Sequence, residues 1–159
     1  MKTLRVLLCV LLVVCTLAGC SAAPKTFTFQ ELSITVPGEL KDVSSKSEFY
    51  QYTFTLDSDE MAVFGNREPA GQLNASGMTL EDYAELIHTA NGFSFIPTQR
   101  AGHDYLYSYN EATADGTAFK YLIGYFQDGD IFWLIQVAVP VTKYDESVAF
   151  GILDSVTFS

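Results

Sequence analysis

Two short groups of side chains have types and spacings that could support chemistry. His103 precedes Asp104, and a histidine beside a carboxylate is able to relay a proton when a nucleophile lies nearby. Asp57, Asp59 and Glu60 offer several oxygens, which hard cations such as calcium prefer. Their spacing lacks the glycine and the distal glutamate of an EF-hand loop, so a solvated hairpin turn is the competing interpretation. These groups define two alternatives: a hydrolase with an unfamiliar site, and a carrier of calcium or a small molecule.

No established catalytic or cofactor-binding motif accompanies these residues. The sequence has no G-x-S-x-G, G-x-G-x-x-G, Walker-type, H-E-x-x-H or C-x-x-C pattern. The other histidine, His88, falls in an amphipathic helical segment, where a surface or half-buried histidine is the simpler interpretation. We therefore predict a protein that is not an enzyme, with no catalytic residues, no metal site and no cofactor.

The thiol of Cys20 is the reactive group with the most specific local context. Lys2 and Arg5, an apolar run over residues 6–15 and small residues before Cys20 describe a secretory signal peptide. The run is shorter than the roughly 20 apolar residues that a membrane span needs. Its end, Leu-Ala-Gly-Cys at residues 17–20, resembles the lipobox of bacterial lipoproteins, in which the signal is cut before the cysteine and the thiol is lipidated.

The lipobox resemblance implies three segments: a lipoprotein signal peptide (1–19), a lipidated cysteine with a short tether (20–26) and one domain (27–159). Cys9 and Cys15 would leave with the signal, and acylation would account for the cysteine that is left. Several acyl chains anchor firmly, since each buried methylene contributes roughly 0.8 kcal/mol. We predict a lipid-anchored protein on the extracytoplasmic face of a bacterial cell membrane or envelope. An ordinary cleaved signal that contains a cysteine is the alternative.

The size and charge of the mature chain restrict its partners. Removal of 19 residues leaves 140 of 159, enough for one domain with a sizeable core. Without Lys2 and Arg5, seven basic residues face 19 acidic ones, a net charge of −12 (7 − 19). This charge argues against nucleic acid as a partner and against electrostatic attachment to anionic lipid. The acidic residues are spread along the chain, which favours a solvated surface over an acidic binding tract.

Two helices are expected. Thr79 can cap a helix with Asp82 at the matching third position, and Asn91-Gly92 provides a stop. A last helix over residues 143–153 would be capped by Thr142, followed by a final edge strand at residues 156–158. Before these helices, alternating apolar residues predict short strands over residues 27–36, 49–56 and 61–64, and residues 65–77 and 92–103 are expected to be loops.

The segment from Asp104 to Val139 predicts a three-stranded meander. Asp115-Gly116 and Asp128-Gly129 are hairpin signals between long strand-like runs. Two-residue loops at these positions would place Glu111 opposite Lys120. The same registers would place Gly124 between Tyr107 and Trp133, a gap into which large rings can lean. The candidate surface for a partner or ligand comprises Tyr105, Tyr107, Trp133 and Gly124, and the competing interpretation is core beneath a helix.

Both faces of this meander are largely apolar. One face holds Tyr105, Tyr107, Tyr109, Leu122, Phe126, Ile131, Trp133, Ile135 and Val137. The other holds Leu106, Ala112, Phe119, Tyr121, Ile123, Tyr125, Phe132, Leu134 and Ala138. A sheet wetted on one side would alternate apolar and polar residues more cleanly. We therefore predict an α+β fold in which a central antiparallel meander has helices on both faces.

This order of elements resembles that of small lipoproteins with the PsbP-like α/β/α sandwich. The resemblance is carried by FTFQELSITVP, MTLEDYAELI, GTAFKYLIGYFQDGDIFWLIQVAV and FGILDSVTFS, which cover most of the expected domain. The group has no catalytic motif to transfer, and its common theme is binding or assisting a larger partner. The resemblance implies a non-catalytic binding or accessory domain for a larger envelope protein or complex.

Overall fold

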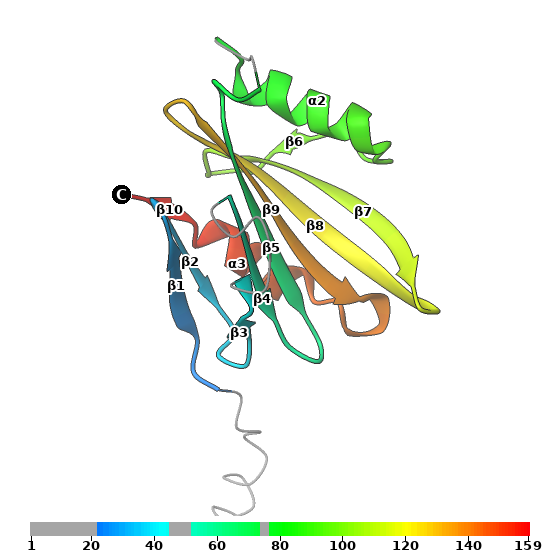
Figure 1. Cartoon of the computed structure of the whole chain (residues 1–159). Coiled ribbons are helices and arrows are strands. Elements are labelled where there is room, and N and C mark those ends of the chain that lie inside the picture. Colours follow the sequence, from blue (N-terminus) through cyan, green and yellow to red (C-terminus); the bar gives the residue numbers. More distant parts are fainter. Residues whose placement is uncertain (1–21, 45–51, 74–76) are drawn as a thin grey trace, which may run out of the picture.

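The computed structural model describes residues 22–44, 52–73 and 77–159, so the predicted signal peptide and Cys20 lie outside the described residues. Within these ranges the chain forms a large and a small antiparallel sheet with two α-helices (Figure 1). None of the described helices is long and apolar enough to cross a membrane. The large sheet has the strand order β3-β4-β5-β9-β8-β7-β6, and the small sheet has the order β1-β2-β10.

The helices are α2 (Leu80–Asn91) and α3 (Glu146–Asp154), with a 3-10 turn, η2, at Val141–Lys143. The small sheet consists of β1 (Lys25–Phe29), β2 (Leu32–Val36) and β10 (Thr157–Phe158). The large sheet consists of β3 (Lys41–Asp42), β4 (Thr53–Asp57), β5 (Ala62–Pro69), β6 (Thr98–Gln99), β7 (Leu106–Ala114), β8 (Thr117–Asp128) and β9 (Ile131–Pro140).

The first predicted hairpin is confirmed and the second is shifted. Between β7 and β8, Asp115 and Gly116 both have positive φ, as a tight hairpin turn requires, and Glu111 lies opposite Lys120. Between β8 and β9, Asp128 pairs with Ile131, so the turn residues are Gly129 and Asp130. Gly129 adopts a φ of 56°, which moves the turn one residue along. The pairing therefore shifts by two positions, which leaves the predicted faces intact.

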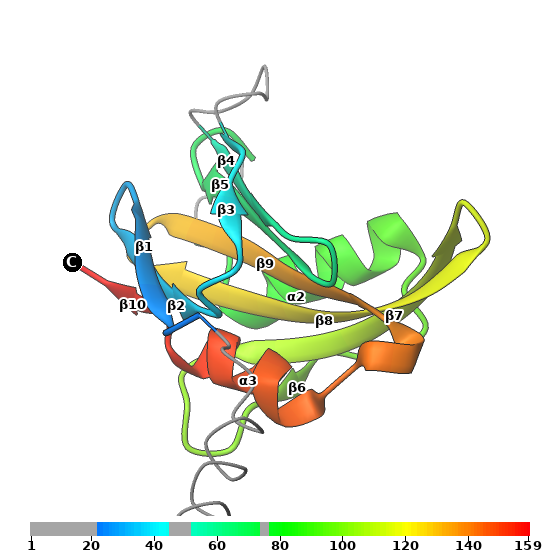
Figure 2. The ribbon, with the colours of Figure 1, turned by 90° about the horizontal axis from the view of Figure 1, so that it is seen from below.

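Each face of the large sheet is covered by a helix, as predicted (Figure 1; Figure 2). On one face, α2 buries Tyr83, whose ring stacks on Phe132 of β9 at 4.6 Å between centroids. On the other face, α3 and the small sheet pack over Leu122, Trp133 and Ile135. Burial of this apolar area from two sides is the main source of stability for such a layered fold. The predicted α+β class is therefore confirmed.

The sequence predicted the cap of α2 correctly, but not the cap of α3. Thr79 caps α2 in a reciprocal capping box with Asp82, and Gly92 ends the helix in the left-handed conformation, as predicted. For α3 the expected start was wrong. Asp145 is the N-cap and accepts hydrogen bonds from the backbone N–H groups of Ser147 and Val148, because an aspartate three residues after Thr142 is itself a strong cap.

Two parts of the sheets differ from the sequence interpretation. The segment from Gly65 was expected to be a loop, but β5 continues to Pro69, because it pairs with β9 along this whole length. Gly65 is a glycine for a packing reason, since a side chain there would overlap the ring of Phe54 on β4. Residues 92–103 were expected to be a loop, but Thr98–Gln99 form the short strand β6, which adds to the outer side of the meander β7-β8-β9. The strand β7 lies near an edge of the sheet, since β6 pairs only with its residues Leu106 and Tyr107. The rest of its outer side has no strand beside it in the described part of the chain.

Candidate functional site

The carboxylate beside the His103 ring belongs to Asp154, whereas the proton-transfer alternative paired His103 with Asp104. His103 Nε2 lies 3.5 Å from Oδ1 of Asp154, which belongs to α3. The same carboxylate accepts hydrogen bonds from Arg100 Nε at 3.1 Å and Nη2 at 2.8 Å, and from the Tyr105 hydroxyl at 2.5 Å. His103 therefore belongs to a network that fastens the loop between β6 and β7 to the end of α3.

The charges in this network are fixed by its own contacts. The hydrogen bonds from Arg100 lower the pKa of the Asp154 carboxyl, against the opposing effect of burial, and Tyr105 contributes further. Burial and the adjacent carboxylate raise the pKa of the Tyr105 phenol. The network therefore pairs an ionised carboxylate with a guanidinium and a neutral phenol, an arrangement suited to holding two elements together.

The acidic residues predicted as possible calcium ligands lie in the turn between β4 and β5. Ser58 organises this turn, because its hydroxyl accepts from the backbone N–H groups of Glu60 and Met61. The Glu60 carboxylate lies 2.5 Å from Lys143 Nζ. Within the residues that the structure describes, no three histidine, cysteine, aspartate or glutamate side chains are grouped so that they could hold a metal ion. The turn interpretation therefore accounts for Asp57, Asp59 and Glu60.

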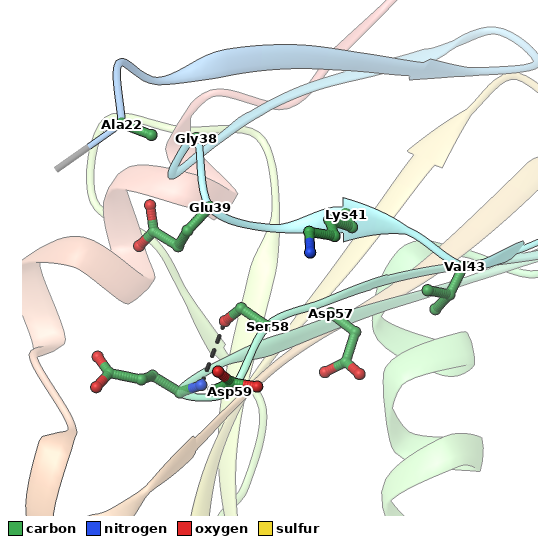
Figure 3. A pocket seen from close by; sticks show the side chains of 9 residues that line it. Ala22, Gly38, Glu39, Lys41, Val43, Asp57, Ser58 and Asp59 are labelled. Carbon is green, nitrogen blue, oxygen red and sulfur yellow. Dashed lines mark hydrogen bonds between the residues drawn. The ribbon is translucent and has the colours of Figure 1, made fainter.

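These residues border a hollow of about 800 Å³ at the point where the described chain begins (Figure 3). Its lining also includes Ala22, Gly38 and Glu39 on the opposite side from the Asp57–Glu60 turn. We call this the tether hollow.

The candidate surface of Tyr105, Tyr107, Trp133 and Gly124 is wrong as an exposed patch. Trp133 is 0% and Tyr105 2% exposed. Gly124 pairs with Tyr107, as predicted, but with Ile135 instead of Trp133. A Cβ on Gly124 would lie 2.6 Å from the Phe126 ring and 3.0 Å from Leu153 of α3, so the gap at this glycine is already filled. Of the four residues, Tyr107 alone is left partly exposed.

A second hollow, of about 680 Å³, lies between β7 and α3. It is lined by Arg100, Tyr107, Tyr109, Asp145, Glu146, Ser147, Phe150, Gly151 and Asp154. We call this the α3 hollow. Three carboxylates and one guanidinium are among its lining residues, and the guanidinium is held by Asp154. The hollow therefore combines aromatic faces with an excess of negative charge.

Four rings form the apolar part of this region, which we call the edge aromatic cluster: Phe95, Tyr107, Tyr109 and Phe150. The ring of Phe150 meets Tyr107 edge-on at 5.0 Å and Tyr109 at 6.5 Å, and Phe95 meets Tyr109 at 6.0 Å. Phe95 is 50% exposed and its neighbour Ile96 is 79% exposed. The cluster is thus continuous with an exposed apolar loop beside the hollow.

Cations already lie on several of these rings. The Arg100 guanidinium carbon is 3.8 Å from the centroid of Phe150, and Lys120 Nζ lies 4.6 Å from that of Tyr109. Such contacts arise because the face of an aromatic ring carries partial negative charge. The Tyr109 hydroxyl donates to Glu146, and burial together with this carboxylate raises the pKa of the Tyr109 phenol. Two rings of the cluster, Phe150 and Tyr109, are therefore in contact with cations of the domain itself.

Sequence reasoning missed most of the α3 hollow. It placed Tyr107 and Tyr109 on one strand face and Phe150 in a helix, but it did not place Arg100, Glu146 and Asp154 beside them. The distance in sequence between Arg100 and Asp154 leaves no local pattern to find. The usable signal was the pair of tyrosines two residues apart in a strand expected to be covered by α3.

Comparison with known proteins establishes the fold and leaves the family open. No family model matches the sequence, and no curated protein matches it. A crystal structure from Bacteroides thetaiotaomicron VPI-5482 is similar, with a TM-score of 0.60 and 14% identity over 85% of this chain and 48% of that one. The present chain thus spans about half the length of that protein.

The Saccharomyces cerevisiae Ran-binding protein Mog1p is similar along nearly its whole length, with a TM-score of 0.56 and 12% identity over 87% of this chain and 96% of that one. Cyanobacterial PsbP from Synechocystis sp. PCC 6803 has a TM-score of 0.48 and 8% identity over 90% and 95% of the two chains. A score this low establishes no relationship, so membership of the PsbP-like group stays a prediction. The α+β fold of this domain is shared with Mog1p and the Bacteroides protein.

Proposed function

We propose that this chain is a bacterial lipoprotein whose domain is a non-catalytic binding or accessory module for a larger protein of the cell envelope. In this proposal, lipid on Cys20 holds the domain at the extracytoplasmic face of the membrane. The Leu-Ala-Gly-Cys sequence after a basic start and an apolar run supports the anchor. A covalent anchor suits a mature chain with a net charge of −12 (7 − 19), since this charge opposes attachment to anionic lipid.

The observation that carries the binding role is the α3 hollow with the edge aromatic cluster. Aromatic side chains that carry a polar group, such as tyrosine, are enriched at protein–protein interfaces. Here Tyr107 and Tyr109 are partly buried against the core and also line the hollow. Phe95 and Ile96 extend the apolar surface outward. In this region the rings that pack on the core also line an open hollow.

The chemistry of the hollow favours a particular kind of partner segment. Asp145 and Glu146 line it together with the rings of Tyr107 and Phe150. Carboxylates next to aromatic faces attract lysine or arginine side chains. The adjacent outer side of β7 beyond Tyr107 has no strand beside it in the described chain, and such an edge can accept an extended peptide. We therefore expect a partner segment that is extended and carries a basic residue.

The fold itself is compatible with this role. Mog1p, which shares the fold, is named a Ran-binding protein, so a domain of this shape is able to present a surface to another protein. At 12% identity the likeness concerns the fold, and no binding residue is transferred from Mog1p.

Site-specific crosslinking in intact cells tests the proposal. A photoreactive phenylalanine analogue at Phe95 is expected to form a discrete adduct with one envelope protein. The same analogue at Leu86 is the matched control, because Leu86 is similarly exposed but lies on α2, across the sheet. Equal adducts from both positions, or none from Phe95, would contradict the proposal.

Two further measurements separate the components of the proposal. The intact mass of the purified native protein should show a chain that begins at Cys20 and bears acyl groups. Titration calorimetry with calcium chloride should give no heat of binding, and a measurable affinity would favour the carrier alternative.

A further inference from the structure

The first described residues are clamped onto the domain. Ala22 and Ala23 run across Gly38, where a Cβ would overlap the carbonyl oxygen of Ala23 and lie 2.8 Å from Ala22 Cβ. Glycine is the residue that allows this close approach of two backbones. Lys25, at the start of β1, donates a hydrogen bond from Nζ to the carbonyl of Leu40.

The surface that receives this segment is itself firmly held. Leu40 is fully buried, and its N–H donates to the carbonyl of Pro37 at 3.2 Å. The pairing of Lys25 with Val36 joins β1 to β2 directly before this turn. The tether therefore ends as part of the folded domain at Ala22 and does not continue as a free linker to residue 26.

The remaining distance to the predicted anchor is very short. Only Ser21 lies between Cys20 and Ala22, and an extended chain spans at most about 3.6 Å for each of the two steps from Cα to Cα. The Cα atom of Cys20 is therefore at most roughly 7 Å from the Cα atom of Ala22. The sulfur that would carry the acyl chains is farther away by no more than the length of the cysteine side chain. A domain held this closely has little freedom to turn away from the bilayer.

The end of the domain that meets the bilayer follows from the strand pairing. Lys41 of β3 pairs with Asp57, so the turn at Pro37–Leu40 and the turn after β4 lie at the same end. Figure 3 shows Ala22 and Gly38 across the tether hollow from Asp57 and Asp59. The turn between β8 and β9 lies at the opposite end, because Pro69 at the end of β5 pairs with Ile131.

We propose that the clamp of Ala22 and Ala23 on Gly38 makes the turns at Pro37–Leu40 and Asp57–Glu60 the face that docks on the headgroup layer of the bilayer. This inference rests on the proposed lipidation of Cys20. The α3 hollow is then left accessible at the side, because β7 lies five strand positions from β3, roughly 24 Å across the sheet. Membrane and partner therefore use separate surfaces.

The docking face carries four carboxylates, those of Glu39, Asp57, Asp59 and Glu60, against the one lysine of the same lining, Lys41, so anionic headgroups repel it. We therefore choose vesicles of phosphatidylcholine as the probe. The full mature lipoprotein is reconstituted in them with a spin label on a single added cysteine, in the variants Asp59→Cys and Asp130→Cys. Both positions are exposed, and the eight residues of β5 separate their turns by about 26 Å.

Collision with a nickel-chelating headgroup lipid is the readout. We expect a severalfold higher collision rate for the label at residue 59 than for the label at residue 130. A flexible insert of about ten Gly/Ser residues between Ser21 and Ala22 adds roughly 18 Å of reach and should remove most of this difference. Equal rates in the acylated protein without the insert would overturn the inference.

A glycine pair tests the clamp itself. Gly38→Ala should reduce the difference between the two labels, while Gly71→Ala, at a glycine with open space around it, should leave it unchanged. If Gly38→Ala does not fold, the linker insert still decides the question. A mass that lacks acyl groups would overturn the anchor proposal, whereas equal label rates on an acylated, membrane-bound chain would overturn only the docking orientation.

Discussion

Two aromatic clusters lie on the same face of the large sheet, and one of them is closed while the other is open. In the closed cluster, the rings of Phe29 and Phe54 lie 6.1 and 6.3 Å from Trp133, and Phe27 packs on Phe54 at 5.3 Å. The small sheet covers this cluster. The edge aromatic cluster lies beside β7, where α3 begins, and part of it faces the α3 hollow.

The polar groups of the two clusters differ in the same way. The Trp133 indole N–H donates to Glu31 at 3.1 Å, and Arg67 holds the same carboxylate from 2.9 Å. Each buried polar group of this trio is matched inside the protein. In the edge cluster, Tyr109 and Arg100 are also paired, but their carboxylates Glu146 and Asp154 line an open hollow. The closed cluster is therefore satisfied within the fold, whereas the edge aromatic cluster stays open on the side where we propose that a partner binds.

Trp133→Ala is the change with the largest expected effect. It removes a fully buried indole from β9, which should lower the free energy of unfolding by about 3–5 kcal/mol. Denaturant-induced unfolding followed by circular dichroism measures this. A loss below about 1 kcal/mol would contradict the assignment of Trp133 to a closed core, because surface substitutions have effects of that size.

Alanine at Gly124, which α3 covers, and at Gly151, within α3, should change the stability of the protein in opposite directions. Gly124→Ala should destabilise the protein by about 1–3 kcal/mol, since the added Cβ meets the Phe126 ring and Leu153. Gly151→Ala should stabilise it by about 0.5–1 kcal/mol, because this helical glycine has open space around its Cα and alanine favours the helix. Thermal unfolding of both variants measures the signs. If the two shifts had the same sign, the boundary between core and hollow would be misplaced.

The sequence predicted the closed part of the molecule better than the open part. Periodicity placed Trp133 and Leu122 on one face and Tyr125 on the other, because a strand alternates with a period of two whatever its exact register. This is why the two-position error between β8 and β9 did no harm to the faces. Whether another element buries a residue of the sheet, however, depends on contacts between distant segments of the chain. Nothing local distinguishes Trp133, which the small sheet covers, from Tyr107, which α3 covers only in part.

Glu31 in the closed cluster and Asp154 beside the edge aromatic cluster should lose their contributions to stability at different pH values. The contacts with its own backbone N–H, Arg67 and Trp133 outweigh the effect of burial and lower the pKa of Glu31 below its ordinary value of 4.5. The contact with Arg100 lowers the pKa of Asp154 below 3.8. A carboxyl with a lowered pKa in the folded state adds stability above its unfolded pKa, and this stability is lost as the pH falls through the folded pKa.

We therefore expect Glu31→Gln and Asp154→Asn each to cost about 1–2 kcal/mol at pH 7 and progressively less as the pH falls below about 4. Urea unfolding at pH 7, 4 and 3 measures the change for each variant. The decrease should begin at a higher pH for Glu31→Gln. A cost that is the same at every pH would show that neither carboxylate acts through its charge.

Phe95→Ala should have the smallest effect on stability and the largest effect on binding. Half of this ring is exposed, so its removal should change the free energy of unfolding by less than about 0.5 kcal/mol. It also removes the outermost ring of the edge aromatic cluster, which contacts Tyr109 at 6.0 Å. A photoreactive group at Ile96, next to it, should lose its adduct when Phe95 is alanine and keep it when Leu86 is alanine. An adduct that survives Phe95→Ala would contradict the proposed role of the edge aromatic cluster in binding.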